Sequence, residues 1–284
     1  MGAQIGCEYA LGGHDVALVA RDTAAVDARV DRAWALVETQ RLAPPDVVAV
    51  ARSRTTISGS LDGDASRCDL AVESLPEILE LKAELLGGIA AASPDAILAS
   101  NTSSIPITTL GEAIGAPERV IGTHYLNPPL LMPTVEVIPG VHTREAITAR
   151  VAEIIESLGK RPVVVRRDVP GFIWNRLQFA LLRECAWLVD NGVAQPEDVD
   201  LVMREGLARR WRRVGPFAAI GLGGIDTWSR SAANLVPELS TASELGDLGR
   251  FAERDARELE AIATARDAHL AAELRTEREA HGSA

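Results

Sequence analysis

Short apolar runs that alternate with helical patterns constrain the fold of this chain more than any other feature of its sequence. Strand-like runs cover residues 14–20, 54–58, 69–74, 96–100, 119–122, 134–138 and 162–166. Between them, apolar residues recur with helical spacing, as over residues 23–42 and 143–157. Strands that alternate with helices predict an α/β fold, with helices on both faces of a doubly wound parallel sheet.

The alternation stops at Asp168-Val169-Pro170-Gly171, and only helical patterns follow. The first of them is an amphipathic stretch from Phe172 to about Asn191. A chain of 284 residues can bury two cores of modest size. We therefore expect two domains, an α/β domain over residues 1–167 and an all-α domain over residues 168–284.

Charge and cysteine usage exclude several classes of partner. A net charge of −11 argues against nucleic acid and anionic membranes as partners, because both require a basic surface. No apolar run approaches the ~20 residues of a membrane span, and we expect no signal peptide before the fold. Cys7, Cys68 and Cys185 follow no metal-ligand spacing, so we expect no metal site and read them as reduced packing residues of a cytoplasmic protein.

One histidine and one glutamate stand where an α/β sheet carries catalytic groups. His124 follows the apolar run 119–122 and precedes the loop signal Asn127-Pro128-Pro129, at the carboxyl end of a strand. Glu136 lies in a strand so apolar that its carboxylate needs a partner. A carboxylate that accepts from one imidazole nitrogen fixes the tautomer in which the other nitrogen takes a proton. The alternative is a packed histidine and a surface strand glutamate.

Three motifs in this region occur in the order of a known family. The chain contains the motifs SNTSS (residues 100–104), GTHYLNPP (122–129) and MPTVEVI (132–138). They resemble the SNTSS, GTHFFNPP and MPLVEVI segments of the L-3-hydroxyacyl-CoA dehydrogenases, also called 3-hydroxybutyryl-CoA dehydrogenases. The resemblance implies a Rossmann-like domain and a helical domain that builds a homodimer. It also implies oxidation of the 3-hydroxy group of an acyl-CoA or related thioester by a nicotinamide cofactor.

The resemblance also implies roles for individual residues. His124 would be the base in oxidation and the acid in reduction, and Glu136 would orient it. Ser103 and Asn175, the latter in a segment similar to the family's PGFIxNR, would hold the reacting oxygen. The cofactor-binding set would include two residues near the nicotinamide ribose, Glu73 and Lys82, together with Gly2 and Asn101.

The amino-terminal sequence departs from this family. Residues 1–11 read as a helix that leads into the strand at 14–20, which is the second half of a nucleotide-binding βαβ unit. Met1-Gly2 matches only the last two residues of the family's GxGxMG turn, so we expect the first strand and the leading glycines to be absent. That absence would leave an unpaired backbone edge inside the sheet. An upstream start and a truncated relative with impaired cofactor binding both explain the pattern.

The end of the second expected strand bears on the choice of cofactor. Enzymes that use NAD usually carry an acidic residue there for the ribose hydroxyls, whereas a nearby arginine accommodates the phosphate of NADP. This chain has Ala20-Arg21-Asp22 instead, which favours NADP over NAD. The alternative is a solvated Arg21–Asp22 pair that opens a helix at Thr23.

Two rival functions remain at this level. The same proton chemistry would serve an acyl-carrier-protein thioester or a free 3-hydroxy acid. In a different class, the chain could be a non-catalytic dimerising module that has lost cofactor binding.

Overall fold

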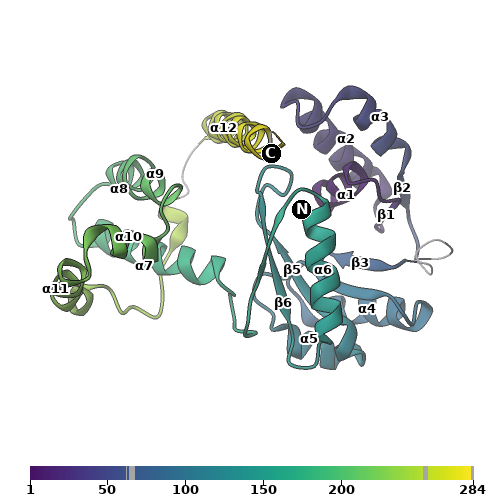
Figure 1. Cartoon of the computed structure of the whole chain (residues 1–284), viewed down its shortest axis with the longest axis horizontal. Helices are drawn as coiled ribbons and strands as arrows, with labels where there is room; N and C mark the ends of the chain where they lie inside the picture. The colour runs from purple at the N-terminus through teal and green to yellow at the C-terminus, as the bar shows by residue number, and fades with distance from the viewer. Residues whose placement is uncertain (62, 64–67, 252–254, 283–284) are drawn as a thin grey trace. The chain divides into compact units, whose positions relative to one another are not determined.

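The computed structural model describes residues 1–61, 63, 68–251 and 255–282, which form two compact units (Figure 1). The first unit comprises Met1–Ile173 together with the carboxyl-terminal helix α12 (Ala256–Gly282), and the second comprises Trp174–Asp255. The expected boundary at residue 167 therefore lies six residues early. The expected assignment of α12 to the helical domain also differs from the structure, because the carboxyl half of this helix buries its apolar face on the first unit.

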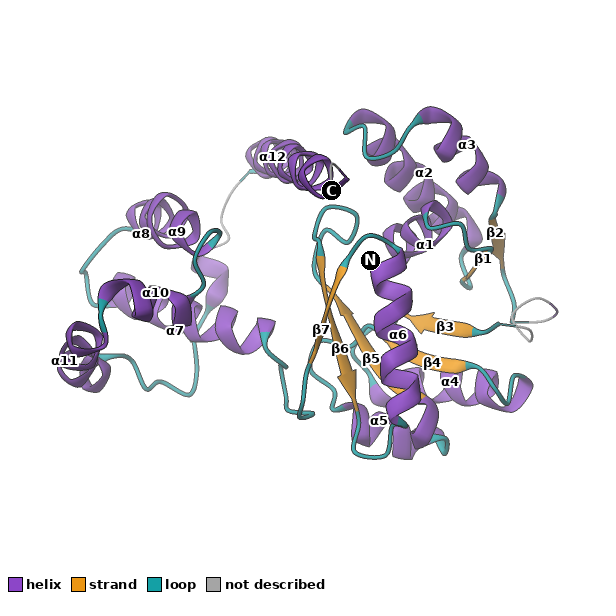
Figure 2. Cartoon of the chain, viewed as in Figure 1, coloured by secondary structure: helices purple, strands orange, loops and turns teal. Residues whose placement is uncertain are grey.

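The first unit alternates strands and helices, as the sequence predicts (Figure 2). Its elements are α1 (Gly2–Leu11), β1 (Val16–Val19), α2 (Thr23–Thr39), α3 (Pro45–Ser53), β2 (Thr55–Ser58), β3 (Leu70–Glu73), α4 (Leu79–Ala92), β4 (Ile97–Ser100), α5 (Ile107–Ile114), the 3-10 turn η2 (Pro117–Arg119), β5 (Val120–Tyr125), β6 (Thr134–Pro139), α6 (Glu145–Ser157) and β7 (Arg161–Val164). Helix α3 was not predicted, since the helical spacing noted above ends at residue 42. In the structure Pro45 opens that helix at its first position, where its missing N–H is not needed.

The described strands form two sheets. Strands β1 and β2 pair in parallel, and a second sheet has the order β3-β4-β5-β6-β7. Of the described strands, only β2 pairs with β1 and only β4 pairs with β3, so β1 and β3 each have one unpaired edge, as the sequence led us to expect. All neighbours in the larger sheet are parallel except β5 and β6. The sheet is therefore mixed rather than wholly parallel.

Helices cover both faces of the larger sheet, which is the doubly wound arrangement. On one face, α1 and α6 pack on alternate strand residues such as Ile121 and Val135. On the other face, α4 and α5 pack on the residues between them, such as Val120 and Ile138. Period-two alternation therefore decides which face each strand residue serves.

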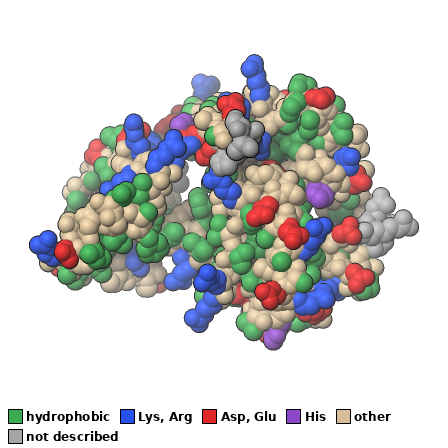
Figure 3. All heavy atoms as spheres, in the orientation of Figure 1, with side chains coloured by type: hydrophobic (Ala, Val, Ile, Leu, Met, Phe, Trp, Pro, Cys, Tyr) green, Lys and Arg blue, Asp and Glu red, His purple; other side chains and the backbone are tan. Residues whose placement is uncertain are grey.

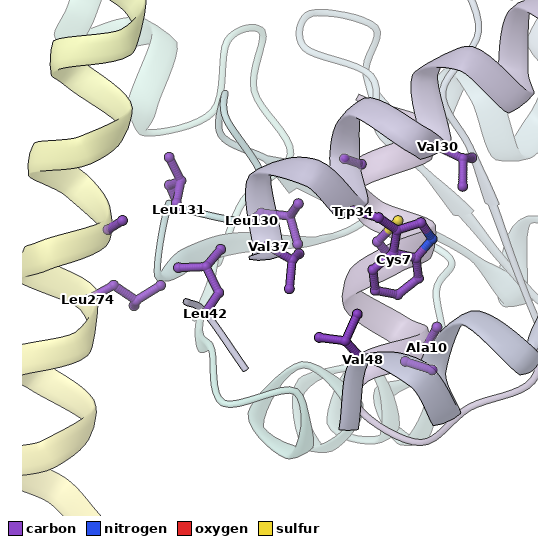
Figure 4. Packing of buried hydrophobic residues seen from close by; sticks show 13 residues of the cluster. Cys7, Ala10, Val30, Trp34, Val37, Leu42, Val48, Leu130, Leu131 and Leu274 are labelled. Carbon is purple, nitrogen blue, oxygen red and sulfur yellow. The ribbon is translucent and has the colours of Figure 1, made fainter. Parts of the chain in front are cut away.

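A third cluster joins α1, α2 and α3 to the carboxyl-terminal helix. Cys7, Trp34 and Val37 lie in it, and Figure 4 shows Leu274 of α12 facing Leu42 and Leu131. Arg275 and Arg278 of α12 donate to the backbone carbonyls of Gln40 and Leu42, beyond the end of α2. These contacts hold α12 on the first unit.

The second unit is helical throughout its described elements. These are α7 (Trp174–Asp190), α8 (Pro196–Val202), the π-helical segment η3 (Met203–Ala208), α9 (Arg209–Trp211), α10 (Pro216–Gly223), α11 (Ile225–Leu235) and the 3-10 turns η4 (Val236–Glu238) and η5 (Leu248–Phe251). Figure 3 shows hydrophobic side chains on its surface. The most exposed are Phe217 at 86% and Leu222 at 78%. None of the described helices combines the length and apolar character that crossing a membrane requires.

Candidate active site

His124 and Glu136 face each other across the antiparallel pair β5–β6. The register places them directly opposite, and His124 Nδ1 lies 2.6 Å from Glu136 Oε2. Both side chains are almost fully buried, with 5% and 3% of the residue exposed. Period-two alternation puts both on the sheet face that α4 and α5 cover, opposite to Val135 and Val137. The structure thus brings together the two residues that the sequence singled out.

The pairing leaves one imidazole nitrogen for chemistry. A buried carboxylate at hydrogen-bond distance favours the tautomer with the proton on Nδ1. Within the described part of the chain, no hydrogen bond other than that to Glu136 reaches the His124 ring. In that tautomer Nε2 carries the lone pair of the ring.

The segment that follows β7 contacts both members of this pair. The Ile173 N–H donates to the second carboxylate oxygen of Glu136, Oε1, at 2.8 Å. The Phe172 ring meets the His124 ring edge-on, with centroids 5.6 Å apart. The sequence suggested neither contact, because both span long separations along the chain.

The loop after β4 carries Ser103 and is organised by a glutamate that the sequence did not single out. Glu77 Oε1 accepts from the Thr102 hydroxyl at 2.5 Å and from the Ser103 and Ser104 amides at 2.9 and 2.8 Å. Partial burial raises the pKa of Glu77, but the hydrogen bonds from Thr102, Ser104 and Ser103 outweigh that effect and lower the pKa to about 2. The acidic side chain between Pro76 and the start of α4 at Leu79 was the signal available in the sequence.

Asn101 links two strand ends in the same region. Its side-chain oxygen accepts from the Tyr125 amide at 2.8 Å, and its own amide donates to the Glu73 carbonyl at 2.9 Å. Asn101 thus holds the end of β4 against the residue after His124. Its contact with a cofactor stays a prediction.

Glu73 and Lys82 pair with each other instead of facing solvent. Lys82 Nζ lies 2.9 Å from Glu73 Oε1, and their side chains are 1% and 0% exposed. Ser100 also donates to Glu73, and Lys82 donates to the Leu75 carbonyl at 3.1 Å. A ribose contact by either side chain would require this buried pair to open, so in this structure both hold β3, β4 and α4 together.

The amino end of α1 fits the diphosphate of a dinucleotide. No side chain caps this helix, so its first backbone amides are available to an anion. A Cβ placed on Gly2 would lie 3.5 Å from the Cβ of Ser74, just past β3, whose buried hydroxyl has no hydrogen-bond partner in the described structure. Gly2 therefore lies beside a polar group, the Ser74 hydroxyl, that would hydrogen-bond to an oxygen of a bound ligand.

Arg21 follows β1 on the surface. The Asp22 carboxylate accepts from the Ala25 amide at 2.9 Å and so caps α2. Arg21 and Asp22 are both exposed and α2 begins at Thr23, which is the arrangement considered as the alternative. The Asp22 carboxylate is thus engaged by the helix, and Arg21 is exposed.

Asn175 is the second residue of α7 and belongs to the second unit. Its approach to the reacting oxygen stays a prediction. No group of three or more histidine, cysteine, aspartate or glutamate side chains in the described chain is arranged to hold a metal ion.

Both parts of the chain match family models. Residues 1–169 match the NAD binding domain of 3-hydroxyacyl-CoA dehydrogenase, and residues 171–254 match its carboxyl-terminal domain. Helix α12 begins at Ala256, beyond both matches.

Individual relatives carry different names. A 5-formyl-3-hydroxy-2-methylpyridine 4-carboxylate 5-dehydrogenase of Mesorhizobium japonicum is 40% identical over 188 residues, which are 66% of this chain and 61% of that protein. An L-carnitine dehydrogenase of a Pseudomonas species is 38% identical over 223 residues, 76% of this chain and 68% of that protein. The chain thus matches less than two thirds of the first of these relatives.

A solved structure matches almost the whole chain. It is a 5-formyl-3-hydroxy-2-methylpyridine 4-carboxylic acid 5-dehydrogenase, described as an NAD+-dependent dismutase, with a TM-score of 0.88 and 30% identity. The match covers 99% of this chain and 96% of that one.

Proposed function

The chain belongs to the 3-hydroxyacyl-CoA dehydrogenase family, and from that premise we propose that it transfers a hydride between a nicotinamide cofactor and a substrate that carries a secondary hydroxyl. The observation that carries this proposal is the buried His124–Glu136 pair, with Nδ1 and Oε2 2.6 Å apart. An acid–base pair of this kind moves the proton that must accompany each hydride.

The proton steps follow from the geometry of the pair. In oxidation, His124 Nε2 takes the hydroxyl proton while Glu136 stabilises the imidazolium through Nδ1. In reduction the same nitrogen returns the proton to the new alkoxide. When bound, the nicotinamide supplies the hydride acceptor or donor.

Other groups of the chain would hold the two ligands. The amides at the start of α1, with Gly2, would bind the diphosphate of the cofactor. Ser103 and Asn175 would hold the reacting oxygen and polarise the developing carbonyl. Glu77 supports this assignment for Ser103, because it holds the Ser103 amide at 2.9 Å and so orders the loop.

Acyl-CoA is the substrate class that we propose, because the matched family models carry that name. The names of two relatives, a pyridine 4-carboxylate dehydrogenase and an L-carnitine dehydrogenase, favour a second candidate, a small hydroxy acid without a CoA carrier. The two candidates make different predictions for carrier dependence. Reduction of acetoacetyl-CoA with kcat/KM at least ~100-fold above that of free acetoacetate would favour the thioester, since the carrier would then supply binding energy.

Two substitutions test the catalytic assignment. We expect His124→Ala and Glu136→Gln to lower kcat in acetoacetyl-CoA reduction or in oxidation of a small hydroxy acid, by ~100-fold or more for His124→Ala. The dissociation constant of the cofactor should change little in either variant. A His124→Ala enzyme that keeps wild-type turnover would contradict the proposal.

Arg21 leads us to propose NADP as the preferred cofactor. The Ala20 side chain offers no acceptor for ribose hydroxyls, the Asp22 carboxylate caps α2, and Arg21 is exposed with no ion pair among the described residues. The relative described as NAD+-dependent favours the other choice. Fluorescence titration decides between them: Arg21→Ala should weaken binding of NADPH and leave that of NADH unchanged, and equal weakening of both would refute the assignment.

We further propose a homodimer that forms through the helical unit. Large apolar side chains there are exposed, among them Phe217 at 86% and Leu222 at 78%, and such surfaces mark protein interfaces. Light scattering should report a dimer for the wild type and a monomer for Phe217→Asp. A monomeric wild type would refute this point.

A further inference from the structure

The turn that leaves the first unit touches both members of the buried pair. Glu136 Oε2 meets His124 Nδ1 at 2.6 Å, and Glu136 Oε1 accepts from the Ile173 N–H at 2.8 Å. The Phe172 ring stands at 61° to the His124 ring. A carboxylate whose two oxygens bind two different donors cannot rotate without losing one of them. The turn therefore restrains the group that orients the histidine.

The backbone of this turn has an uncommon conformation. The Phe172 N–H donates to the Val169 carbonyl at 3.1 Å, which closes a four-residue turn with Pro170 and Gly171 at its centre. Gly171 has φ 78°, and Phe172 follows with φ 48°. A phenylalanine in the left-handed region is an outlier that its surroundings must hold in place, and such outliers cluster at functional sites. Here the conformation presents the Ile173 amide to Glu136.

Contacts on the amino-terminal side hold the turn in place. Asp168 Oδ2 accepts from the Thr108 amide at 2.8 Å and from the Thr108 hydroxyl at 2.7 Å, at the start of α5. Val165 and Phe172 are buried in the cluster that α4 and α5 form with the sheet. The turn is thus clamped between the sheet and α5 on one side and Glu136 on the other.

We propose that the Val169–Ile173 turn is a positioning element that sets the orientation of the Glu136 carboxylate, and through it that of His124. This inference rests on the proposed function, because orientation matters only if the pair moves a proton. Ile173 ends the amino-terminal segment of the first unit, and Trp174 begins the helical unit. The amide that binds Glu136 therefore belongs to the last residue before the chain enters the helical unit.

A matched pair of substitutions at Gly171 tests the role of the backbone conformation. Alanine and asparagine both add a Cβ at φ 78°, but asparagine tolerates the left-handed region much better. We expect Gly171→Ala to lower kcat ~10-fold with cofactor binding unchanged, and Gly171→Asn to stay within ~3-fold of wild type. Equal kcat values in the two variants, whether normal or reduced, would overturn the proposal.

If Gly171→Ala does not fold, Phe172→Leu provides the test and Val165→Ala the control. Both substitutions trim a side chain of the same buried cluster, and Phe172→Leu also removes the aromatic ring that meets the His124 ring edge-on. Phe172→Leu should lower kcat several-fold more than Val165→Ala at a comparable loss of thermal stability. An equal loss of kcat would assign the turn a merely structural role.

Amide hydrogen exchange tests the contact without turnover. In Glu136→Ala the Ile173 amide should exchange at least ~10-fold faster, while the Phe172 amide, which donates to Val169, should keep its protection. Unchanged exchange at Ile173 would overturn the inference. By contrast, a wild-type protein without His124-dependent turnover would overturn the proposed function, so the two failures are distinguishable.

Discussion

Replacing Lys160 by methionine should destabilise the first unit strongly and in a pH-dependent way. Lys160 Nζ lies 3.1 Å from Glu8 Oε2, and the two side chains are 1% and 4% exposed. The ammonium also donates to the Pro129 carbonyl at 2.8 Å and to the Met132 carbonyl at 2.9 Å. Lys160 thus ties α1 to the loop that joins the strands of His124 and Glu136.

The structure sets the size of the effect. Methionine fills a similar volume but leaves the Glu8 carboxylate buried without its ion-pair partner, and breaking a buried pair in this way costs about 3–5 kcal/mol. The two carbonyls lose their donor as well. We therefore expect a loss of about 3–5 kcal/mol in the free energy of unfolding near neutral pH.

The sign of the pH dependence follows from Glu8. Burial raises the pKa of Glu8 above its ordinary value of 4.5, and the charge of Lys160 opposes that rise. Without Lys160 the pKa rises further, so the folded variant holds the Glu8 proton more tightly than the unfolded chain does. Stability of the variant therefore falls as pH increases above 4.5, and its deficit relative to wild type grows by up to about 1.4 kcal/mol per pH unit.

Urea unfolding followed by circular dichroism at pH 5.5 and 7.5 measures both quantities. The deficit of Lys160→Met should be larger at pH 7.5, and the double variant with Glu8→Gln should lose most of this pH dependence. A deficit below ~1 kcal/mol at pH 7.5, or one that does not change with pH, would refute the reasoning.

Three further outcomes follow from buried or engaged side chains. Leu274 on α12 is 5% exposed, and Leu274→Ala should lower the free energy of unfolding by about 2–4 kcal/mol in urea titrations. Leu259 on the same helix is 49% exposed, so Leu259→Ala should change the free energy of unfolding little. Equal losses in the two variants would argue against docking of α12. Glu73→Gln should cost up to about 3 kcal/mol by the same assay, because buried Lys82 then keeps only Glu77 Oε2, at 3.4 Å, as an anionic partner; a neutral effect would contradict the buried pair. Glu77→Gln should speed amide exchange at Ser103 and Ser104. In the wild type the Ser103 and Ser104 amides should stay protected from exchange above pH 4.5 and lose that protection as pH falls toward 2, because the folded pKa of Glu77 lies below its unfolded value. Protection that is unchanged at pH 2 would refute this.

The sequence by itself determined most of the elements and singled out both members of the central pair. Alternating apolar runs indicated the strands, and the change of pattern at Asp168 indicated where the α/β part ends. Period-two alternation placed Glu136 opposite to its valine neighbours. These features are local, because the spacing of apolar residues within a strand or helix indicates which of its faces is buried.

Only the tertiary structure decided what those elements meet. In the structure α12 packs on the first unit, although the sequence of α12 indicates only a charged helix. It buried Lys82 against Glu73, and it brought the Ile173 amide to Glu136 across 37 positions of the chain. Each of these contacts joins residues whose separation in sequence follows no period, since packing and the closure of buried hydrogen bonds select such partners in three dimensions.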